Sequence, residues 1–151
     1  MLGVLTPDQC KHVLKSELIG RIGCYAAGRI YVVPITYVYM DNYIYAHSQE
    51  GLKVRMMRKN PKICFEVESR DSMRNWRSVI IWGKYEELKT LTEQKKAMKI
   101  LNDRLLPFTL SESLKTRENM EPPYRVEKER KPVVYRISVD EVTGRFENSR
   151  V

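Results

Sequence analysis

The stretch from Tyr31 to Val67 constrains the fold more than any other part of this sequence. From Tyr31 to Met40 nearly every residue is β-branched or aromatic, which is typical of a strand. Asp41-Asn42 follows, and both residues tolerate the positive φ that a two-residue hairpin turn needs. This turn predicts three cross-strand pairs, which are Met40 with Tyr43, Val38 with Tyr45 and Thr36 with His47.

Both faces of the predicted hairpin carry apolar side chains. One face would hold Thr36, Val38, Met40, Tyr43, Tyr45 and His47, and the other Ile35, Tyr37, Tyr39, Ile44, Ala46 and Ser48. An antiparallel sheet that is apolar on both faces is usually closed into a barrel or covered by a partner subunit. The aromatic surface of Tyr37 and Tyr39 favours a homodimer on this ground.

A helix is predicted after the hairpin, with Ser48 as its N-cap, and it ends near Lys59 because Asn60-Pro61 follows. Free amides at a helix start attract anions, Gly51 permits a close approach to the backbone, and Lys53 adds a positive charge. This pattern predicts a phosphate site. The alternative is an exposed helix with a capping serine and a solvated lysine.

The remaining elements alternate between strands and helices around this centre. Thr6-Pro7 begins a first helix, and Thr90 to Glu93 forms a capping box for a later one that closes at Leu106-Pro107. Further strands are predicted at 21–26, 62–68, 76–88 with a bulge at Gly83, and 131–139, followed by a tail. The residues 70–75 read as a polar connection, and 111–132 as a long surface segment. We therefore predict an α+β fold, a six-stranded antiparallel split β-barrel flanked by α-helices.

Composition limits the class of protein. A chain of 151 residues fits one domain, 1–151, and it has no run of 18 apolar residues and no secretory signal at its start. Cys10, Cys24 and Cys64 suit neither a disulfide framework nor a metal site, so we expect a reducing cytoplasm, with Cys24 and Cys64 as core residues. With only two histidines, His12 and His47, no metal site is expected.

The chain is basic, with a formal net charge of +8. Such a charge suits nucleic acid, or an anionic cofactor and substrate, or a solvated mixed surface. The basic residues form no single block. They gather at Lys53, Arg55, Arg58, Lys59 and Lys62, at Arg70, Arg74 and Arg77, and at Arg125, Lys128, Arg130 and Lys131.

Four segments in order resemble one known family. PITYVYMDNYIYAHSQEGLKVRMMRKNPKICFEVE, RSVIIWGKYEEL, GRIGCYAAGRIYVVP and VYRISVDEVTGR are similar to the FMN-binding split-barrel superfamily of pyridoxamine-phosphate oxidases, in its nitroimidazole-resistance-like branch. The resemblance covers most of residues 18–145. It implies a homodimer with FMN bound at the subunit interface.

The resemblance also implies a set of cofactor-binding residues. The strand Val33, Pro34, Ile35 and Thr36 would lie along the flavin ring and ribityl chain. The phosphate end would contact His47, Ser48, Gly51 and Lys53. Ser78 stands where the oxidases place a glutamine near the flavin. Thr36 and Ser78 could equally be ordinary strand residues, and His47 a packed strand histidine.

The chain departs from the oxidases at two places. Their phosphate-binding arginine corresponds to about Val32, and their C-terminal tryptophan and arginine have no clear match in ISVDEVTGRFENSR. This disfavours pyridoxamine phosphate as the substrate. We expect an oxidoreductase that passes electrons from a donor such as NAD(P)H to a small, nitroimidazole-like or quinone-like acceptor, with His47 as the proton donor.

The alternative function is a non-enzymatic nucleic-acid-binding barrel. Its basis is the charge of +8 and the nine tyrosines, since bases stack on aromatic rings and phosphates attract Lys and Arg. Against it, the tyrosines cluster in one hairpin, where a core or an interface explains them.

Overall fold

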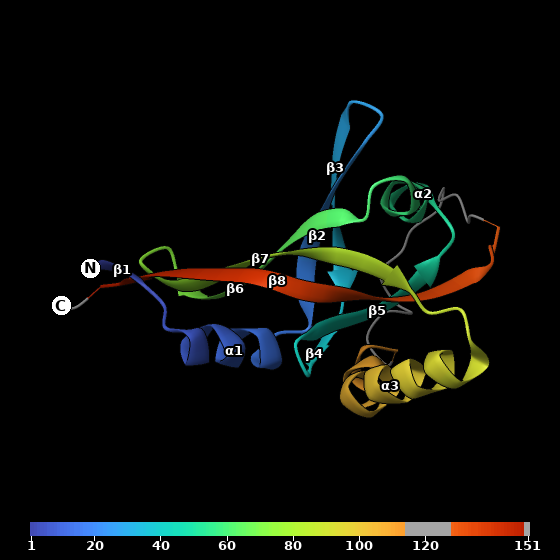
Figure 1. The fold of residues 1–151 in the computed structure, drawn as a ribbon. Helices are drawn as coiled ribbons and strands as arrows, with labels where there is room; N and C mark the ends of the chain where they lie inside the picture. The colour runs from blue at the N-terminus through green and yellow to red at the C-terminus, as the bar shows by residue number, and fades with distance from the viewer. Residues whose placement is uncertain (114–127, 150–151) are drawn as a thin grey trace, which may run out of the picture.

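The structure, a computed structural model, describes residues 1–113 and 128–149. Eight strands and three helices follow one another along the chain (Figure 1). Their bounds are β1 Leu2–Val4, α1 Pro7–Ser16, β2 Ile19–Ala26, β3 Arg29–Thr36, β4 Val38–Met40, β5 Tyr43–Gln49, α2 Leu52–Lys59, β6 Lys62–Ser72, β7 Asn75–Glu87, α3 Leu91–Ser113 and β8 Pro132–Asn148.

All eight strands belong to one antiparallel sheet. Its order is β3-β2-β6-β7-β8-β5-β4, and β1 pairs with the far end of β8. The two ends of this order, β3 and β4, are consecutive in the chain and are separated by Tyr37 alone. The sheet therefore curls until one segment forms both of its ends, with no ladder between them. This confirms the predicted split-barrel α+β fold. Eight strands replace the six expected because β1 is added and Tyr31–Met40 divides into β3 and β4.

The core lies on the inner face of the curled sheet. Tyr37, Phe65 and Tyr135 are fully buried there, and the rings of Tyr37 and Phe65 meet edge to face with centroids 4.8 Å apart. This geometry is favourable for aromatic pairs. The side chains of Val54 and Met57 from α2 close one side of the same core. Burial of this large apolar set is the main force that holds the barrel together.

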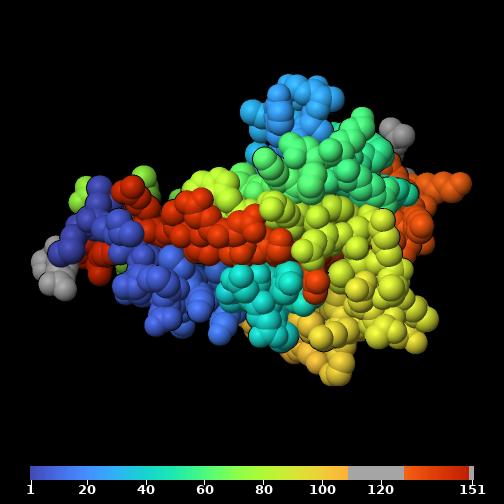
Figure 2. Space-filling model, viewed as in Figure 1, coloured from blue at the N-terminus to red at the C-terminus, as the bar shows by residue number. Residues whose placement is uncertain are grey.

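The helices cover different parts of the sheet (Figure 1). In this view α1 and α3 lie below the sheet and α2 lies above it, next to β2. α3 buries Ala97 and Leu101 against Val38 and Tyr45 of the β4–β5 hairpin. Figure 2 shows the β2–β3 hairpin projecting above the body of the molecule.

The short-range signals are confirmed. Asp41 and Asn42 have φ of 50° and 65°, and they set the predicted pairs of Met40 with Tyr43 and Val38 with Tyr45. Thr6 caps α1 and Thr90 accepts a hydrogen bond from the N–H of Glu93. The β7–β8 register shifts between Trp82 and Gly83, as expected for a bulge near Gly83, but the extra residue is Asp140 on β8 and not a residue of β7. A Cβ on Gly83 would stand 2.1 Å from the carbonyl oxygen of Ser138.

Two predictions around the hairpin are wrong. Thr36 pairs with Ile19 of β2 and not with His47, because the chain breaks its strand at Tyr37 and the N–H of Tyr37 donates to the carbonyl of Leu18. Ser48 is not a helix cap. It belongs to β5, where it pairs with Val133 of β8, and Gly51 takes the N-cap position of α2.

Other boundaries differ because distant pairing and packing extend the elements. β8 continues past Val139 to Asn148 along β7 and β1, so the expected tail is a strand, and β6 and β7 extend into the expected polar connection. α3 continues through Pro107, across which Arg104 lies 5.4 Å from the ring centroid of Phe108. Cys64 is exposed on the outer face and is not a core residue, whereas Cys24 is buried as predicted. Most of the 111–132 segment lies outside the described residues.

Candidate flavin site

The four predicted residues of β3 lie on an edge strand. β3 pairs with β2 only, so half of its main-chain polar groups point away from the ladder. Val33 and Ile35 face the core, whereas Pro34 and Thr36 are exposed on the outer face. Pro34, which pairs with Arg21, sits at this edge because it has no N–H to donate. A ligand at this strand would therefore bind mainly to main-chain groups and less to side chains.

His47 and Ser48 lie at the end of β5. Beyond Tyr45 this strand pairs with β8 only, because β4 begins at Val38, opposite Tyr45. Successive strand residues point to opposite faces, so His47 is exposed on one face while Ser48 is half-buried on the other. The Ser48 hydroxyl donates to the carbonyl of Gln49 at 3.1 Å.

The start of α2 concentrates positive potential. Gly51 caps this helix with no side-chain hydrogen bond, so the first amides keep the partial positive charge of a helix N-terminus. Lys53 is half-buried in the first turn, and burial lowers its pKa. Burial raises the pKa of the Cys24 thiol on β2, and the nearby charge of Lys53 lowers it. The helix that carries Lys53 packs against β2, on which Cys24 is opposite Tyr31 of β3.

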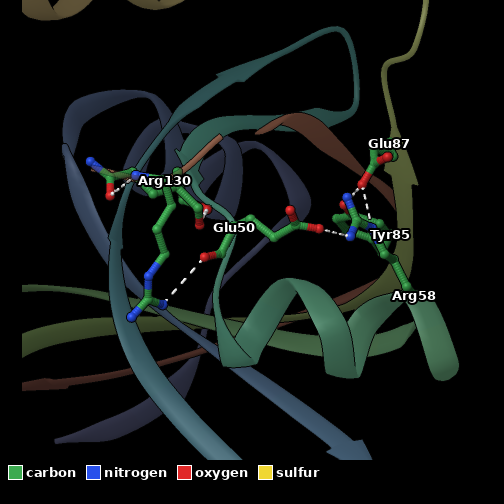
Figure 3. A network of polar contacts seen from close by, with 7 residues as sticks. Glu50, Arg58, Tyr85, Glu87 and Arg130 are labelled. Atoms are coloured by element: carbon green, nitrogen blue, oxygen red, sulfur yellow. Dashed lines mark hydrogen bonds and ion pairs between the residues drawn. The ribbon is translucent and has the colours of Figure 1, made fainter. Parts of the chain in front are cut away.

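An ion-pair network fixes α2 to the end of β7 (Figure 3). Arg58 binds the carboxylate of Glu50 and, at 2.8 Å, that of Glu87, which also accepts a hydrogen bond from the Tyr85 hydroxyl at 2.7 Å. The hydrogen bond from Arg58 lowers the pKa of Glu50. In the sequence Arg58 is only one of many basic residues. Its role in this network could not be predicted, because its two partners lie 8 and 29 positions away.

Arg130 is a second residue whose location in the fold could not be predicted from the sequence. It lies just before β8, and its guanidinium Nη1 is 3.4 Å from the carbonyl oxygen of Glu50, beside the start of α2 (Figure 3). The charged 125–131 cluster was visible in the sequence, but no local pattern connects it with Gly51.

Ser78 is far from the other predicted residues of the same chain. It lies on β7, and both β2 and β6 separate that strand from β3. Three strand spacings of about 4.8 Å place it roughly 14 Å away along the sheet. Its hydroxyl donates to Glu66 at 3.3 Å, and Glu66 also pairs with Arg21 at 3.6 Å. One chain thus packs α2 against β2, the neighbour of β3, and leaves Ser78 apart from β3.

The outer face of the sheet carries an exposed apolar patch. Val32, Gly23, Cys64 and Trp82 stand side by side on four adjacent strands, and Val32 and Trp82 are 61% and 42% exposed. Tyr25 and Ile30 continue this patch toward the tip of the β2–β3 hairpin. Tyr37, by contrast, is fully buried. It therefore cannot contribute the aromatic surface on which the sequence-based expectation of a homodimer rested.

The cavities of the described residues lie elsewhere. The largest of five, with a volume of about 520 Å³, is bounded by α1, the β4–β5 hairpin and α3, and none of the five is lined by a predicted flavin residue. In the same part of the chain, no cluster of three His, Cys, Asp or Glu side chains could hold a metal ion. None of its helices has the length and hydropathy needed to cross a bilayer.

Comparison with known proteins identifies the family. A family model for pyridoxamine 5'-phosphate oxidase matches residues 6–146. The fold is similar to that of an FAD-binding protein from Mesorhizobium loti, with a TM-score of 0.78 and 31% identity, over 99% of this chain and 98% of that one. A candidate 5-nitroimidazole antibiotic resistance protein from Bacteroides thetaiotaomicron shares the fold at a TM-score of 0.69 and 20% identity, over 97% and 87% of the two chains.

An uncharacterized protein from Rhizobium meliloti is 35% identical over 85 residues, which is 56% of this chain. The match spans about half the length of that relative, 56% of it. Because the family model covers nearly the whole described sheet and its helices, the chain belongs to the pyridoxamine 5'-phosphate oxidase family.

Proposed function

We propose that this protein binds FMN non-covalently and uses it as an oxidoreductase that reduces a small, electron-poor acceptor, nitroimidazole-like or quinone-like. The observation that carries this function is the half-buried Lys53 at the uncapped start of α2, a helix that packs against β2, the neighbour of the edge strand β3. Burying a cation is unfavourable unless it meets an anion, so this lysine is expected to have a bound partner. Support for a flavin also comes from the family and from the FAD-binding relative.

The residues present fit the chemistry of FMN. The phosphate would meet the first amides of α2, the ammonium of Lys53 and the Ser48 hydroxyl, with Gly51 leaving the backbone open to close approach. A Cβ on Gly51 would have its nearest neighbour at 3.7 Å, so the space beside it is not filled by the protein. Along β3, the main chain of Val33, Pro34, Ile35 and Thr36 would face the ribityl chain and the ring.

We propose a homodimer in which each flavin lies at the subunit interface. Ser78 cannot reach the same flavin as β3 within one chain, but Ser78 from a second copy could. The exposed patch of Val32, Trp82, Tyr25 and Ile30 supports this assembly, because monomers rarely leave such a contiguous apolar surface in water. The whole chain, 1–151, would act as one flavin-binding domain in the cytoplasm, where the unpaired Cys10, Cys24 and Cys64 remain reduced.

A bound flavin supplies the electron transfer itself. The protein would orient the ring against β3, exclude water through the partner subunit and deliver a proton from His47 to the reduced acceptor. The electrons would come from a donor such as NAD(P)H. The oxidase residues that bind a substrate phosphate lack a match in this chain, which favours an acceptor that stacks on the ring.

Titration of the purified protein with FMN and with FAD tests this function. Flavin fluorescence should show saturable FMN binding in the micromolar range. Both cofactors are needed, because the relative from Mesorhizobium loti binds FAD. If only FAD saturates the protein, FAD and not FMN is the cofactor. If neither flavin saturates it, the proposed flavin function is wrong. The nucleic-acid alternative has less support, since four of the nine tyrosines, Tyr37, Tyr45, Tyr85 and Tyr135, are buried and offer no surface for bases.

A further inference from the structure

We propose that the end of the β6–β7 pair, where α1 packs against it, binds a free α-amino acid with an apolar side chain. This site is independent of the flavin function proposed above. Its central residue is Arg77 of β7, one of the basic group Arg70, Arg74 and Arg77 that the flavin function leaves unused. Ser78, the next residue of the chain, points to the opposite face of the sheet.

The core-facing side of β6 and β7 changes from apolar to polar where α1 covers it (Figure 1). Val67 and Val79 form a fully buried cross-strand pair, and the next pair on the same face is Ser69 with Arg77. These two side chains line a cavity of about 370 Å³, and His12 lines it from α1. Such a volume suits a small molecule. An arginine contributes little to packing at this position, and sequences break local patterns of this kind most often at functional or strained sites.

Two opposite charges face this cavity without meeting. Asp71 and Arg77 both line it, and among the described residues no ion pair joins them. Asp71 is the extra residue of a bulge in β6, and bulges redirect side chains beside binding sites. Its Oδ2 accepts a hydrogen bond from the side chain of Asn75 at 3.3 Å, so one carboxylate oxygen remains for a ligand. A zwitterion fits this arrangement, because its carboxylate can meet Arg77 while its ammonium meets Asp71.

Three donors that line the cavity are available to a ligand. Among the described residues, the side chains of Arg77, His12 and Ser69 make no hydrogen bond and no ion pair. The guanidinium can donate two parallel hydrogen bonds to a carboxylate, and the imidazole and the hydroxyl can each donate one more. The carboxylate of the ligand therefore belongs at this end of the cavity.

A second hollow, of about 250 Å³, adjoins the cavity, and Trp76 and Arg77 line both. Leu5 and Phe146 add apolar side chains to this hollow, and Phe146 is opposite Arg77 in the β7–β8 ladder. A molecule held by Arg77 can therefore place an apolar group here, away from water. The indole N–H of Trp76 donates to the carboxylate of Glu147 at 3.1 Å, which fixes the ring beside the hollow.

Tryptophan fluorescence tests this site, because Trp76 lies in its wall. The measurement is made in Trp82→Phe, which leaves Trp76 as the one tryptophan of the chain. L-Leucine and L-phenylalanine should change its emission saturably, with dissociation constants of about 1 mM or lower. L-Alanine lacks the large apolar side chain, and isocaproate is leucine without its ammonium group. Each of these two should bind at least about tenfold more weakly than L-leucine.

Substitutions at the two charged residues separate their roles. Arg77→Ala should weaken L-leucine binding by about tenfold to a hundredfold, and Arg77→Lys should recover part of the loss. Asp71→Asn keeps the shape of the side chain and should abolish the preference for L-leucine over isocaproate. The control is Arg74→Ala, which should bind L-leucine as the wild type does, because Arg74 is exposed between β6 and β7 and lines neither hollow.

Three results would overturn the proposal. The first is no saturation by either L-leucine or L-phenylalanine, and the second is equal affinity of the wild type for L-leucine and isocaproate, which would leave Asp71 without a role. The third is wild-type affinity for L-leucine in both Arg77→Ala and Asp71→Asn, which would place the binding elsewhere. If Arg77→Ala has a lower unfolding midpoint than the wild type, Asp71→Asn decides, because a changed preference between two ligands does not follow from lost stability.

Discussion

The hydroxyl of Tyr37 donates a hydrogen bond of 2.8 Å to the main-chain carbonyl of Leu14, 23 residues earlier. Tyr37 is the residue that joins the two ends of the sheet, and Leu14 is in the last turn of α1. Carbonyls in the last turn of a helix lack partners within it, so this bond satisfies a buried acceptor. The same contact fixes α1 to the point where the barrel changes from β3 to β4.

Tyr37→Phe should therefore destabilise the protein by about 1–2 kcal/mol, because it removes the donor and leaves the Leu14 carbonyl without its partner. Urea unfolding followed by fluorescence would measure the change. The matched control is Tyr39→Phe, which removes a phenol from a half-buried tyrosine two residues away and should cost less than about 0.5 kcal/mol. Equal losses in the two variants would contradict a specific role of the Tyr37 bond.

The remaining carbonyls of this helix end explain a further long-range contact. Arg104 of α3 donates to the carbonyls of Lys15 and Ser16 at 3.2 and 3.3 Å. A guanidinium also interacts favourably with the negative end of a helix dipole. Neither Tyr37 nor Arg104 could be identified as a helix cap from the sequence, since capping patterns are read over three or four residues and these contacts span 23 and 89.

The sequence predicted what local chemistry decides. Asp41-Asn42 permits one tight turn, and Thr6 with Gln9 forms a complete capping box, so both features were located to the residue. Ser48 shows the limit. It has the composition of a helix cap, but pairing with Val133 on β8 keeps it in a strand, and the competing partner lies 85 positions later. For the same reason β1 and the last third of β8, which stabilise each other, had no signal of their own.

In the candidate site, too, local features could be predicted from the sequence and long-range contacts could not. The pattern from Ser48 to Lys53 predicted a helix start, which the structure places at Gly51, three residues later than the expected cap, and Lys53 is half-buried there. Arg130 and Arg58 were visible only as charges, because what each contacts depends on the fold. The apolar patch around Val32 was missed since the alternation of β3 and β2 gives no sign of which face becomes the core when both faces carry apolar residues.

Lys53→Met should make the protein more stable and the cofactor weaker. Burial lowers the pKa of Lys53, so the folded state disfavours its charge and the unfolded state binds more protons at alkaline pH. Removing the ammonium should stabilise the protein at neutral pH, and the gain in stability should shrink as the pH rises through the titration of lysine. FMN affinity should fall about tenfold to a hundredfold.

Thermal melts at several pH values and FMN titration would measure both effects. Lys59→Met is the control, because Lys59 is exposed in the last turn of the same helix, where a positive charge is slightly favourable. That variant should lose a few tenths of a kcal/mol and leave FMN affinity unchanged. A destabilised Lys53→Met protein would show that the lysine has a structural partner instead of a ligand.

Val32→Glu should convert the proposed dimer to a monomer. Val32 is 61% exposed in one chain, so its replacement costs the isolated fold little, but an unpaired carboxylate in an apolar interface costs several kcal/mol. Light scattering should give about twice 17.8 kDa for the wild-type protein and 17.8 kDa for the variant. Leu91→Glu, at an equally exposed apolar residue outside the patch, should remain dimeric. A wild-type mass of one chain at micromolar concentration would remove the dimer.

His47→Ala tests the proposed proton donor. His47 is exposed at the end of β5, on the opposite face from Ser48, so an acceptor could reach it from solvent without displacing the phosphate end of the cofactor. General acid catalysis by a positioned side chain contributes about a hundredfold to ten-thousandfold in rate.

Reduced, FMN-loaded protein is mixed anaerobically with a nitroimidazole, and reoxidation of the flavin is followed by absorbance. The rate should fall about a hundredfold in His47→Ala and remain unchanged in His12→Ala, which removes the other histidine, exposed on α1. Equal rates in the wild type and His47→Ala would assign proton delivery to water, and no reoxidation in either would exclude nitroimidazoles as acceptors.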